Sequence, residues 1–181
     1  MEKIKKLRKL FETFNIDGYI VPKNDEFFSE YTDLEKDNLK YISNFSGSFG
    51  LGLILKKENY LFVDGRYTLQ AKNQSGKFFK IITIPKFFPK TIFKKNKLKI
   101  GFDPKLHTEK MLSLFFGNCS LKLVPINQNL INKISIKKTQ RKKEGYFILP
   151  KNAYDISYKQ KIKKLIKIMK KEKIDLQFIT A

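Results

Sequence analysis

Two short apolar runs that lie close together constrain the fold of this chain more than any other feature. The runs are LGLIL at residues 51–55 and YLFV at residues 60–63, and the charged stretch KKEN separates them. Apolar runs of this length bounded by polar residues predict β-strands, and so short a connection predicts a hairpin whose register it fixes. The second strand continues into DGRYTLQAKNQ, which we interpret as a sharp turn followed by a helix.

Strands and helices alternate along the rest of the first 135 residues. An amphipathic first helix is predicted from apolar side chains at helical spacing, namely Ile4, Leu7, Leu10, Phe11 and Phe14. Further strands are expected at residues 19–23, 79–84, 97–103 and 120–126, and further helices near 34–42, 106–116 and 128–134. This alternation predicts a layered α/β domain over residues 1–140, in which helices flank a mixed β-sheet.

The chain beyond residue 140 has a different pattern. Residues 141–156 are charged and then proline-bearing, which suits a linker. Ser157 can cap the helix that follows, and LQFITA after it is predicted to be a buried strand. The apolar face of the helix consists of Tyr158, Ile162, Leu165 and Met169. Because KIMKKEKIDLQFI resembles KLFETFNIDGYIV, we interpret residues 157–181 as the first helix and strand of a truncated second, similar domain.

The net charge of +21 raises the question of an anionic partner. Only Arg8, Arg66 and Arg141 are arginine, although arginine is the residue best suited to paired contacts with phosphate and guanine. The first 71 residues carry 11 basic and 11 acidic residues, so the whole excess falls on residues 72–181. We therefore do not expect nucleic-acid binding to be the main role, and we interpret the lysines as a solvated surface.

Neither a membrane segment nor a disulfide is predicted. No apolar run approaches the roughly 18 residues that span a bilayer, and the basic N-terminus lacks the continuous apolar segment of a signal peptide. The single Cys119 rules out an internal disulfide and a cysteine-based metal cluster, and we expect it to be partly buried and inert. A cytoplasmic location is the resulting expectation.

The sequence offers no complete set of catalytic or metal-binding residues. His107 is the only histidine, and no carboxylate lies at a spacing that would join it at a metal, so we expect a helix-start or surface residue. Ser46 and Ser48 in SGSFG lack the G-x-S-x-G frame of a nucleophile. We expect Gly47 and Gly50 to supply positive φ angles and to let this loop pass close to its neighbour.

The residues that follow the second hairpin strand are the best candidates for a site. Asp64 can cap the next helix, Gly65 allows the sharp change of direction, and Arg66 and Tyr67 would project from the first helical turn. An arginine in a chain that otherwise uses lysine suggests a need for the fork geometry of the guanidinium. Two interpretations stay open: a buried arginine–carboxylate pair that fixes the strand end, which we favour, or part of a binding cleft.

Five motifs follow one another in an order that matches a known family. They are DEFFSEY, DNLKYISNFSGSFGLGLIL, YLFVDGRYTLQA, IGFDP and LVPINQNLINKI. Together they resemble the amino-terminal domain of the Xaa-Pro aminopeptidases, in the creatinase and methionine-aminopeptidase superfamily, and are most similar to the three-domain cytosolic type. The matching positions are Asp25, Ser29 to Tyr31, Ser43 to Gly50, Val63 to Ala71 and Asn129 to Ile134. The chain departs from the family in having no Trp, in Asn44 and Phe49 within the loop, and in Asn132 where aspartate is usual.

The resemblance implies a three-layer α/β domain with a ribonuclease H-like motif. It implies that the intact enzyme releases the first residue from peptides whose second residue is proline. That chemistry uses two divalent metal ions, usually manganese, held by two Asp, one His and two Glu of a carboxy-terminal domain. None of that domain is within these residues, so we expect a non-catalytic fragment with no cofactor of its own.

The resemblance also implies what this fragment would contact. Its partners would be the missing second and catalytic domains of the same chain and the second subunit of a homodimer, and proline-containing peptides would be the substrate of the intact enzyme. The residues that would support the substrate cleft or an interface are Ser46, Ser48, Asp64, Arg66 and Tyr67.

Two alternatives stay open beside this interpretation. A stand-alone basic module for nucleic acid or anionic surfaces belongs to a different class, and loss of all DNA or RNA binding at ~150 mM salt would exclude it. An amino-terminal domain from a creatinase-like or proline dipeptidase relative is the alternative within the family, and only the missing domain separates it from an aminopeptidase.

Hydrogen exchange tests the division of the chain. The segment after residue 153 has no second layer to pack against, so its backbone amides should exchange much faster than those of the sheet. Mass spectrometry of peptides from residues 157–181 and from the hairpin at residues 51–63 compares the two in one sample. Equal protection of both peptides would contradict the division.

Overall fold

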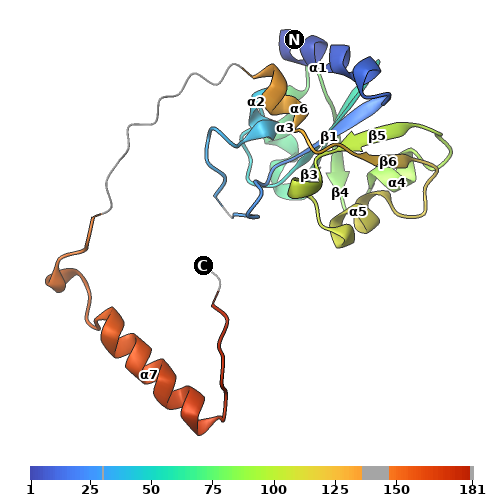
Figure 1. Cartoon of the computed structure of the whole chain (residues 1–181). Coiled ribbons are helices and arrows are strands. Elements are labelled where there is room, and N and C mark those ends of the chain that lie inside the picture. Colours follow the sequence, from blue (N-terminus) through green and yellow to red (C-terminus); the bar gives the residue numbers. More distant parts are fainter. Residues whose placement is uncertain (30, 136–146, 180–181) are drawn as a thin grey trace. The chain divides into compact units, whose positions relative to one another are not determined.

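Six strands form one mixed sheet in the first of two structural units, which divide after Lys138. The computed structural model describes residues 1–29, 31–135 and 147–179. The strands are β1 (Gly18–Pro22), β2 (Leu51–Leu55), β3 (Asn59–Asp64), β4 (Lys80–Ile84), β5 (Lys99–Phe102) and β6 (Lys122–Pro125). Their order in the sheet is β4-β3-β2-β1-β5-β6 (Figure 1).

The predicted hairpin is confirmed and lies at the centre of this sheet. β2 pairs antiparallel with β3, with Leu51 opposite Phe62 and Leu53 opposite Tyr60. β2 also pairs antiparallel with β1, whereas β1–β5, β5–β6 and β3–β4 are parallel. Of the six strands, β2 alone therefore runs against the others, and the other five have their carboxyl ends at one edge.

The side chains of the central strands alternate between two apolar cores, one on each face of the sheet. On β3, Leu61 and Val63 belong to one core, and Tyr60 and Phe62 belong to the other. Successive side chains of an extended strand point to opposite faces of the sheet. Both sets are apolar here because both faces are covered. The sheet is therefore the middle of three layers.

Helices supply the two outer layers. The first core contains buried residues of α1 (Glu2–Thr13), α2 (Asn38–Ser43), α3 (Thr68–Ser75) and α6 (Leu130–Ile134). The second contains Phe115 and Phe116 of α5 (Glu109–Phe116), with Ile92 of α4 (Pro89–Ile92) packed against it. The predicted α/β fold, with a mixed sheet flanked by helices in three layers, is confirmed (Figure 1).

Local capping shifts several helix boundaries from their predicted positions. α2 begins at Asn38 because the Asp37 carboxylate accepts a hydrogen bond from the Lys40 backbone N–H at 2.9 Å. α5 begins at Glu109 after the Thr108 cap, and a separate 3-10 helix occupies Pro104–Leu106. Another 3-10 helix, Gly65–Tyr67, precedes α3, and the short helix α4 lies between β4 and β5, where no helix was predicted.

The prediction of positive φ angles at glycine is wrong, because none of the described glycines has one. Asparagines take that role at Asn15, Asn44 and Asn118. The other expectation for Gly47 is met, since a Cβ there would lie 2.3 Å from the Phe45 ring and 2.9 Å from the Tyr67 ring. At Gly65 neither a positive φ angle nor close packing requires glycine. Its φ is not positive, and an added Cβ would have no atom within 4 Å outside the neighbouring residues.

The second unit contains α7 (Tyr158–Lys171), whose predicted cap is present. Ser157 accepts a hydrogen bond from the Gln160 backbone N–H, and the Gln160 side chain accepts one from the Ser157 N–H. The strand predicted from LQFITA is absent over the described residues 176–179, which are exposed. A strand needs a paired neighbour for its backbone groups, and the described part of this unit provides none. Residues 141–146 of the expected linker lie outside the described residues.

Truncation of a core leucine should show how much of the stability depends on the two-sided burial of the sheet. Leu53 is fully buried in the second core, so Leu53→Ala should lower the free energy of unfolding by about 2–5 kcal/mol. Leu69→Ala is the matched control, because Leu69 is 72% exposed and the same truncation should change stability by less than ~0.5 kcal/mol. Urea unfolding of both variants measures the difference, and equal effects would contradict the two-core description.

Candidate functional site

Segments far apart in the sequence meet at the carboxyl edge of the sheet. Leu51 at the start of β2 pairs with Pro22 at the end of β1 and with Phe62 near the end of β3. The last residue of β5, Phe102, pairs with the last residue of β6, Pro125. Binding sites in open α/β sheets form at this edge, because the loops that leave the strands gather there.

Asp64 and Arg66 form an exposed pair at the end of β3. Asp64 caps the 3-10 helix as predicted, because its Oδ1 accepts a hydrogen bond from the Arg66 backbone N–H at 2.9 Å. The guanidinium returns to the same carboxylate, with Nη2 2.7 Å from Oδ2, and this contact lowers the pKa of Asp64. The Arg66 side chain is 74% exposed, so the pair is not the buried one that we favoured. It fixes a strand end and still leaves the guanidinium open to other groups.

Ser48 and Tyr67 are brought together by the close packing around Gly47. The Ser48 hydroxyl lies 2.7 Å from the Tyr67 hydroxyl, and the Tyr67 ring meets Phe45 edge-on with centroids 5.9 Å apart. Phe45 is fully buried, so it holds the Tyr67 ring against the body of the domain. Two of the predicted site residues therefore share a hydrogen bond that spans the loop before β2 and the turn after β3.

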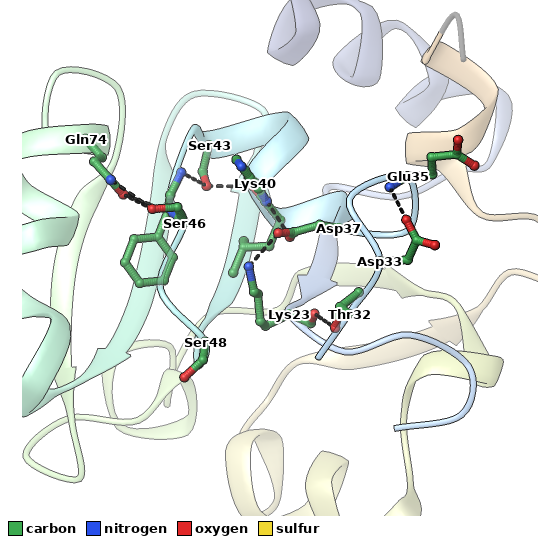
Figure 2. A network of polar contacts seen from close by, with 12 residues as sticks. Lys23, Thr32, Asp33, Glu35, Asp37, Lys40, Ser43, Ser46, Ser48 and Gln74 are labelled. Carbon is green, nitrogen blue, oxygen red and sulfur yellow. Dashed lines mark hydrogen bonds and ion pairs between the residues drawn. The ribbon is translucent and has the colours of Figure 1, made fainter. Parts of the chain in front are cut away.

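Ser46 faces a different partner, α3. Its backbone N–H donates to Gln74 Oε1 at 2.9 Å, and its hydroxyl accepts from Gln70 Nε2 at 2.9 Å. Figure 2 shows Ser46 directed toward Gln74, with Ser48 further along the same loop. Ser46 thus ties the loop to a helix and does not share the contacts of Ser48.

An aromatic and acidic loop, described over residues 24–29 and 31–37, connects β1 to α2. Lys23, which directly follows β1, fixes the loop at two points. Its Nζ lies 2.5 Å from Asp37 Oδ2, and its carbonyl oxygen accepts a hydrogen bond from the Thr32 hydroxyl at 3.1 Å (Figure 2). Asp25 closes the first turn by accepting from the Phe27 and Ser29 backbone N–H groups, each at 3.0 Å. These bonds keep the loop backbone in place while its aromatic side chains remain exposed.

A pocket of about 480 Å³, which we call the aromatic pocket, lies between this loop and the Ser48–Tyr67 turn. Its lining includes Ser48 and Arg66 together with the side chains of Phe28, Tyr31, Phe49, Met111 and Phe115. Tyr31, Phe28 and Phe49 are 87%, 43% and 41% exposed, so these three rings are available to a ligand or to another protein surface, whereas Phe115 is buried. Neither the loop nor α5 was predicted to contribute to this pocket. The aromatic residues in the polar stretch DEFFSEY were a signal for the loop, and the sequence carried none for α5.

His107 lies deeper than predicted. Its Nδ1 is 2.9 Å from the Asp103 carbonyl oxygen, its ring meets Phe102 edge-on with centroids 5.5 Å apart, and its buried Nε2 has no hydrogen-bond partner in the described structure. Burial lowers the pKa of the imidazole. A neutral histidine with Nδ1 donating to a carbonyl belongs to the packing of the β5 end. Of the two expected positions, His107 takes the one at a helix start, directly before the Thr108 cap of α5, and not the one at the surface.

The described residues do not fit a metal centre, since they include no group of three or more His, Cys, Asp or Glu side chains able to hold an ion. Cys119 is partly buried as expected, with its thiol 2.8 Å from the Phe116 carbonyl oxygen. No described helix is both long and apolar enough to cross a bilayer.

The chain is similar to known proteins over nearly all of its length. Residues 3–134 match the family model of the creatinase/prolidase N-terminal domain. A probable Xaa-Pro aminopeptidase P of Coprinopsis cinerea is 32% identical over 179 residues, which cover 92% of this chain and 28% of that protein.

Two solved structures show the same likeness. The X-prolyl aminopeptidase of Caenorhabditis elegans, described as a cytosolic enzyme with a di-nuclear active site, superposes with a TM-score of 0.73 and 27% identity over 95% of this chain and 31% of that one. The Xaa-Pro dipeptidase of Bacillus anthracis gives a TM-score of 0.60 and 27% identity over 77% of this chain and 37% of that one. The chain thus spans 28–37% of the length of these three relatives.

Acidification should weaken the fold through His107. The unfolded chain takes up a proton on this imidazole near its usual pKa of about 6.5, whereas the folded chain does so only at a lower pH. The stabilising contribution is therefore complete above pH ~6.5 and is lost as pH falls through the lowered pKa.

Urea unfolding of the wild type and of His107→Asn at pH 7.5, 6.0 and 5.0 measures this loss. The asparagine amide can still donate to the Asp103 carbonyl but does not titrate, so the variant should lose less stability on acidification. Identical pH profiles would show that His107 does not contribute.

Proposed function

Because the chain belongs to the creatinase/prolidase N-terminal domain family, we propose that it is the non-catalytic amino-terminal domain of an Xaa-Pro aminopeptidase. The observation that supports the proposal most is the share of this chain that aligns with known aminopeptidases. The aminopeptidases of Coprinopsis cinerea and Caenorhabditis elegans match 92% and 95% of this chain, including the second unit, within proteins about three times as long.

The intact enzyme would release the first residue from peptides whose second residue is proline. The Caenorhabditis elegans relative is described as having a di-nuclear active site, and we propose a comparable pair of divalent ions, manganese in the first instance, for the enzyme to which this chain belongs. The residues described here do not fit such a centre, so its ligands would come from a catalytic domain outside these 181 residues. The cytosolic description of that relative also supports a cytoplasmic location.

The contribution of this domain would be to shape the substrate cleft and to support a homodimer. Ser48, Arg66 and Tyr67 lie on turns whose geometry is fixed by hydrogen bonds and by the packing of Phe45, at the edge where such sheets present binding surfaces. The exposed rings of the aromatic pocket offer apolar area for a neighbouring domain or subunit to cover. Asp64 and Ser46 would act indirectly, by holding the two turns in place.

The second unit would begin a further domain of similar construction. We propose residues 1–140 as the first domain, 141–156 as the linker and 157–181 as the beginning of the second, which opens with α7. α7 supports this, because four of its apolar side chains are substantially exposed, namely Tyr158, Ile162, Ile166 and Ile168. An amphipathic helix of this kind gains its stability in proteins from packing against other elements.

The alternative of a proline dipeptidase relative has one observation in its favour, the shared fold of the Bacillus anthracis enzyme. That likeness covers 77% of this chain, whereas the likeness to the Caenorhabditis elegans aminopeptidase covers 95%. The aminopeptidase is therefore the function that the comparisons support better.

An activity assay tests the proposal. The 181-residue chain, supplied with manganese and a peptide with proline second, should show no release of the first residue, because the ligands for a metal pair would lie elsewhere. The protein encoded by the uninterrupted reading frame should release it under the same conditions. Turnover by the short chain at the rate of the long one would contradict the proposal. Hydrolysis of an Xaa-Pro dipeptide, but not of longer peptides with proline second, by the long protein would identify a proline dipeptidase instead.

A further inference from the structure

Lysines gather at the amino edge of the sheet, opposite the edge that carries the candidate site. Five strands begin at this edge and the β2–β3 hairpin turns there, so it brings together residues 17–18, 55–59, 76–80, 94–99 and 118–122. These segments contain two carboxylates, Asp17 and Glu58. They also contain nine lysines, which we call the lysine edge, namely Lys56, Lys57, Lys77, Lys80, Lys94, Lys95, Lys97, Lys99 and Lys122.

Backbone pairing places part of the lysine edge in one row. Lys99 lies opposite Lys122 in the β5–β6 ladder. The Lys99 carbonyl oxygen accepts a hydrogen bond from the Asp17 N–H at 2.7 Å, and the Asp17 carbonyl oxygen accepts one from the Lys56 N–H at 3.2 Å. Adjacent strands lie roughly 4.8 Å apart, so the edge of the six strands is a level row about 24 Å wide.

Most of this positive charge is not neutralised within the described structure. Lys56 pairs with Asp17 and Lys80 with Glu58, each at 2.6 Å, and the other seven lysines form no ion pair with a described residue. All nine are exposed except Lys99, which is half-buried. Nine lysines and two carboxylates leave a net charge of +7 on one edge of a small domain.

A lysine-rich composition alone does not account for this distribution. The loop at the opposite edge has the reverse balance, because residues 24–37 contain six acidic residues and one lysine. The two edges of the sheet therefore carry opposite charge. The resulting field would turn the domain so that the lysine edge faces an anionic partner.

The residue types at this edge fit a flat anionic layer better than a nucleic acid. Lysine is a compact, strongly hydrated charge that needs no paired geometry with its partner. Proteins that bind single-stranded nucleic acid add several aromatic rings on which bases stack. Among the segments of the lysine edge, Phe78 offers the one exposed ring, 38% exposed with Lys77 Nζ 5.7 Å from its centroid.

We propose that the lysine edge binds the anionic lipid headgroups of a membrane surface. Attraction to such a layer falls off within a Debye length, about 8 Å at physiological salt, so the lysines must approach it together. A level row of strand starts permits that approach. The candidate site lies at the opposite edge and stays uncovered, so this contact does not depend on the proposed function.

Cosedimentation with lipid vesicles tests the contact in the full 181-residue chain. Vesicles of phosphatidylcholine with phosphatidylserine should bind the chain, and vesicles of phosphatidylcholine alone should not. Raising the salt from ~50 to ~300 mM should release the chain, because the Debye length shrinks. Equal binding to both kinds of vesicle, or binding that salt does not change, would overturn the proposal.

A triple variant removes charge from the lysine edge itself. Lys57→Gln, Lys97→Gln and Lys122→Gln together neutralise three exposed lysines that form no ion pair with a described residue. Each lysine close to an anionic membrane contributes about fivefold, so binding should weaken on the order of 100-fold. Circular dichroism checks that the variant is folded.

Two triple variants with the same loss of charge serve as controls. One lies on elements that follow the carboxyl ends of β1 and β5, and it combines Lys40→Gln, Lys105→Gln and Lys110→Gln. The other lies on α7 and combines Lys163→Gln, Lys164→Gln and Lys167→Gln. Both should weaken binding far less than the variant of the lysine edge. A loss as large in either control would place the contact elsewhere or reduce it to net charge, and would refute the proposal.

Competition with soluble polyanions separates a membrane from other anionic partners. Single-stranded RNA or polyglutamate, at the same concentration of negative charge as the lipid, should leave most of the chain on the vesicles. Complete displacement by RNA would identify a nucleic acid as the preferred partner, and complete displacement by polyglutamate would identify an acidic polypeptide. Either result would count against a lipid surface.

Discussion

Every residue of β2 is buried, and its side chains alternate between the two cores. A strand in this position has no face that water can reach, so both of its faces must be covered by helices and its polar chemistry is confined to its ends. The three-layer arrangement follows from that requirement. So does the position of the aromatic pocket, because polar side chains can be accommodated at the carboxyl edge, where the chain leaves the apolar interior.

Aspartates cap several of the helical turns that begin at this edge. Asp37, Asp64 and Asp103 each accept a hydrogen bond from a backbone N–H at the start of a helical turn. Their carboxylates thereby set the direction in which the chain departs from the sheet. Lys23 and Arg66 then pair with two of these groups, so that positive charge is held at the rim of the aromatic pocket.

The sequence was sufficient to predict the hairpin, the order of the elements and the fold class, because those features depend on runs of apolar residues that are local in the chain. Helix starts were less predictable, since whether Asp37 or Thr108 acts as a cap depends on backbone geometry that the pattern alone does not specify. The strand expected from LQFITA failed for a different reason: its apolar pattern is suitable, but a strand exists only where a neighbour pairs with it. Positive φ angles occur at Asn15, Asn44 and Asn118, and also at Phe28 and Lys173, but at none of the described glycines. Asn tolerates the left-handed region, so a glycine in a loop was an unreliable guide.

The contacts of the candidate site likewise comprise local ones that could be predicted from the sequence and tertiary ones that could not. The Asp64 cap and its link to Arg66 were predictable because the residues are two apart, whereas the Ser48–Tyr67 hydrogen bond and the contribution of Met111 and Phe115 depend on the tertiary fold. Exposure was the least predictable property. Arg66, expected in a buried pair, is largely in solvent, and His107, expected at a helix start or at the surface, lies directly before α5 with its ring packed against Phe102.

The apolar surface of the second unit has a consequence for handling the molecule. Phe147, Ile148, Leu176 and Phe178 are each at least 79% exposed, and they flank a helix whose own apolar face is open. Exposed apolar segments of this kind drive aggregation when no partner covers them, and a lysine-rich surround opposes it only while salt is low. The solubility of the 181-residue polypeptide is therefore governed by its last thirty-odd residues and not by the well-packed domain that precedes them.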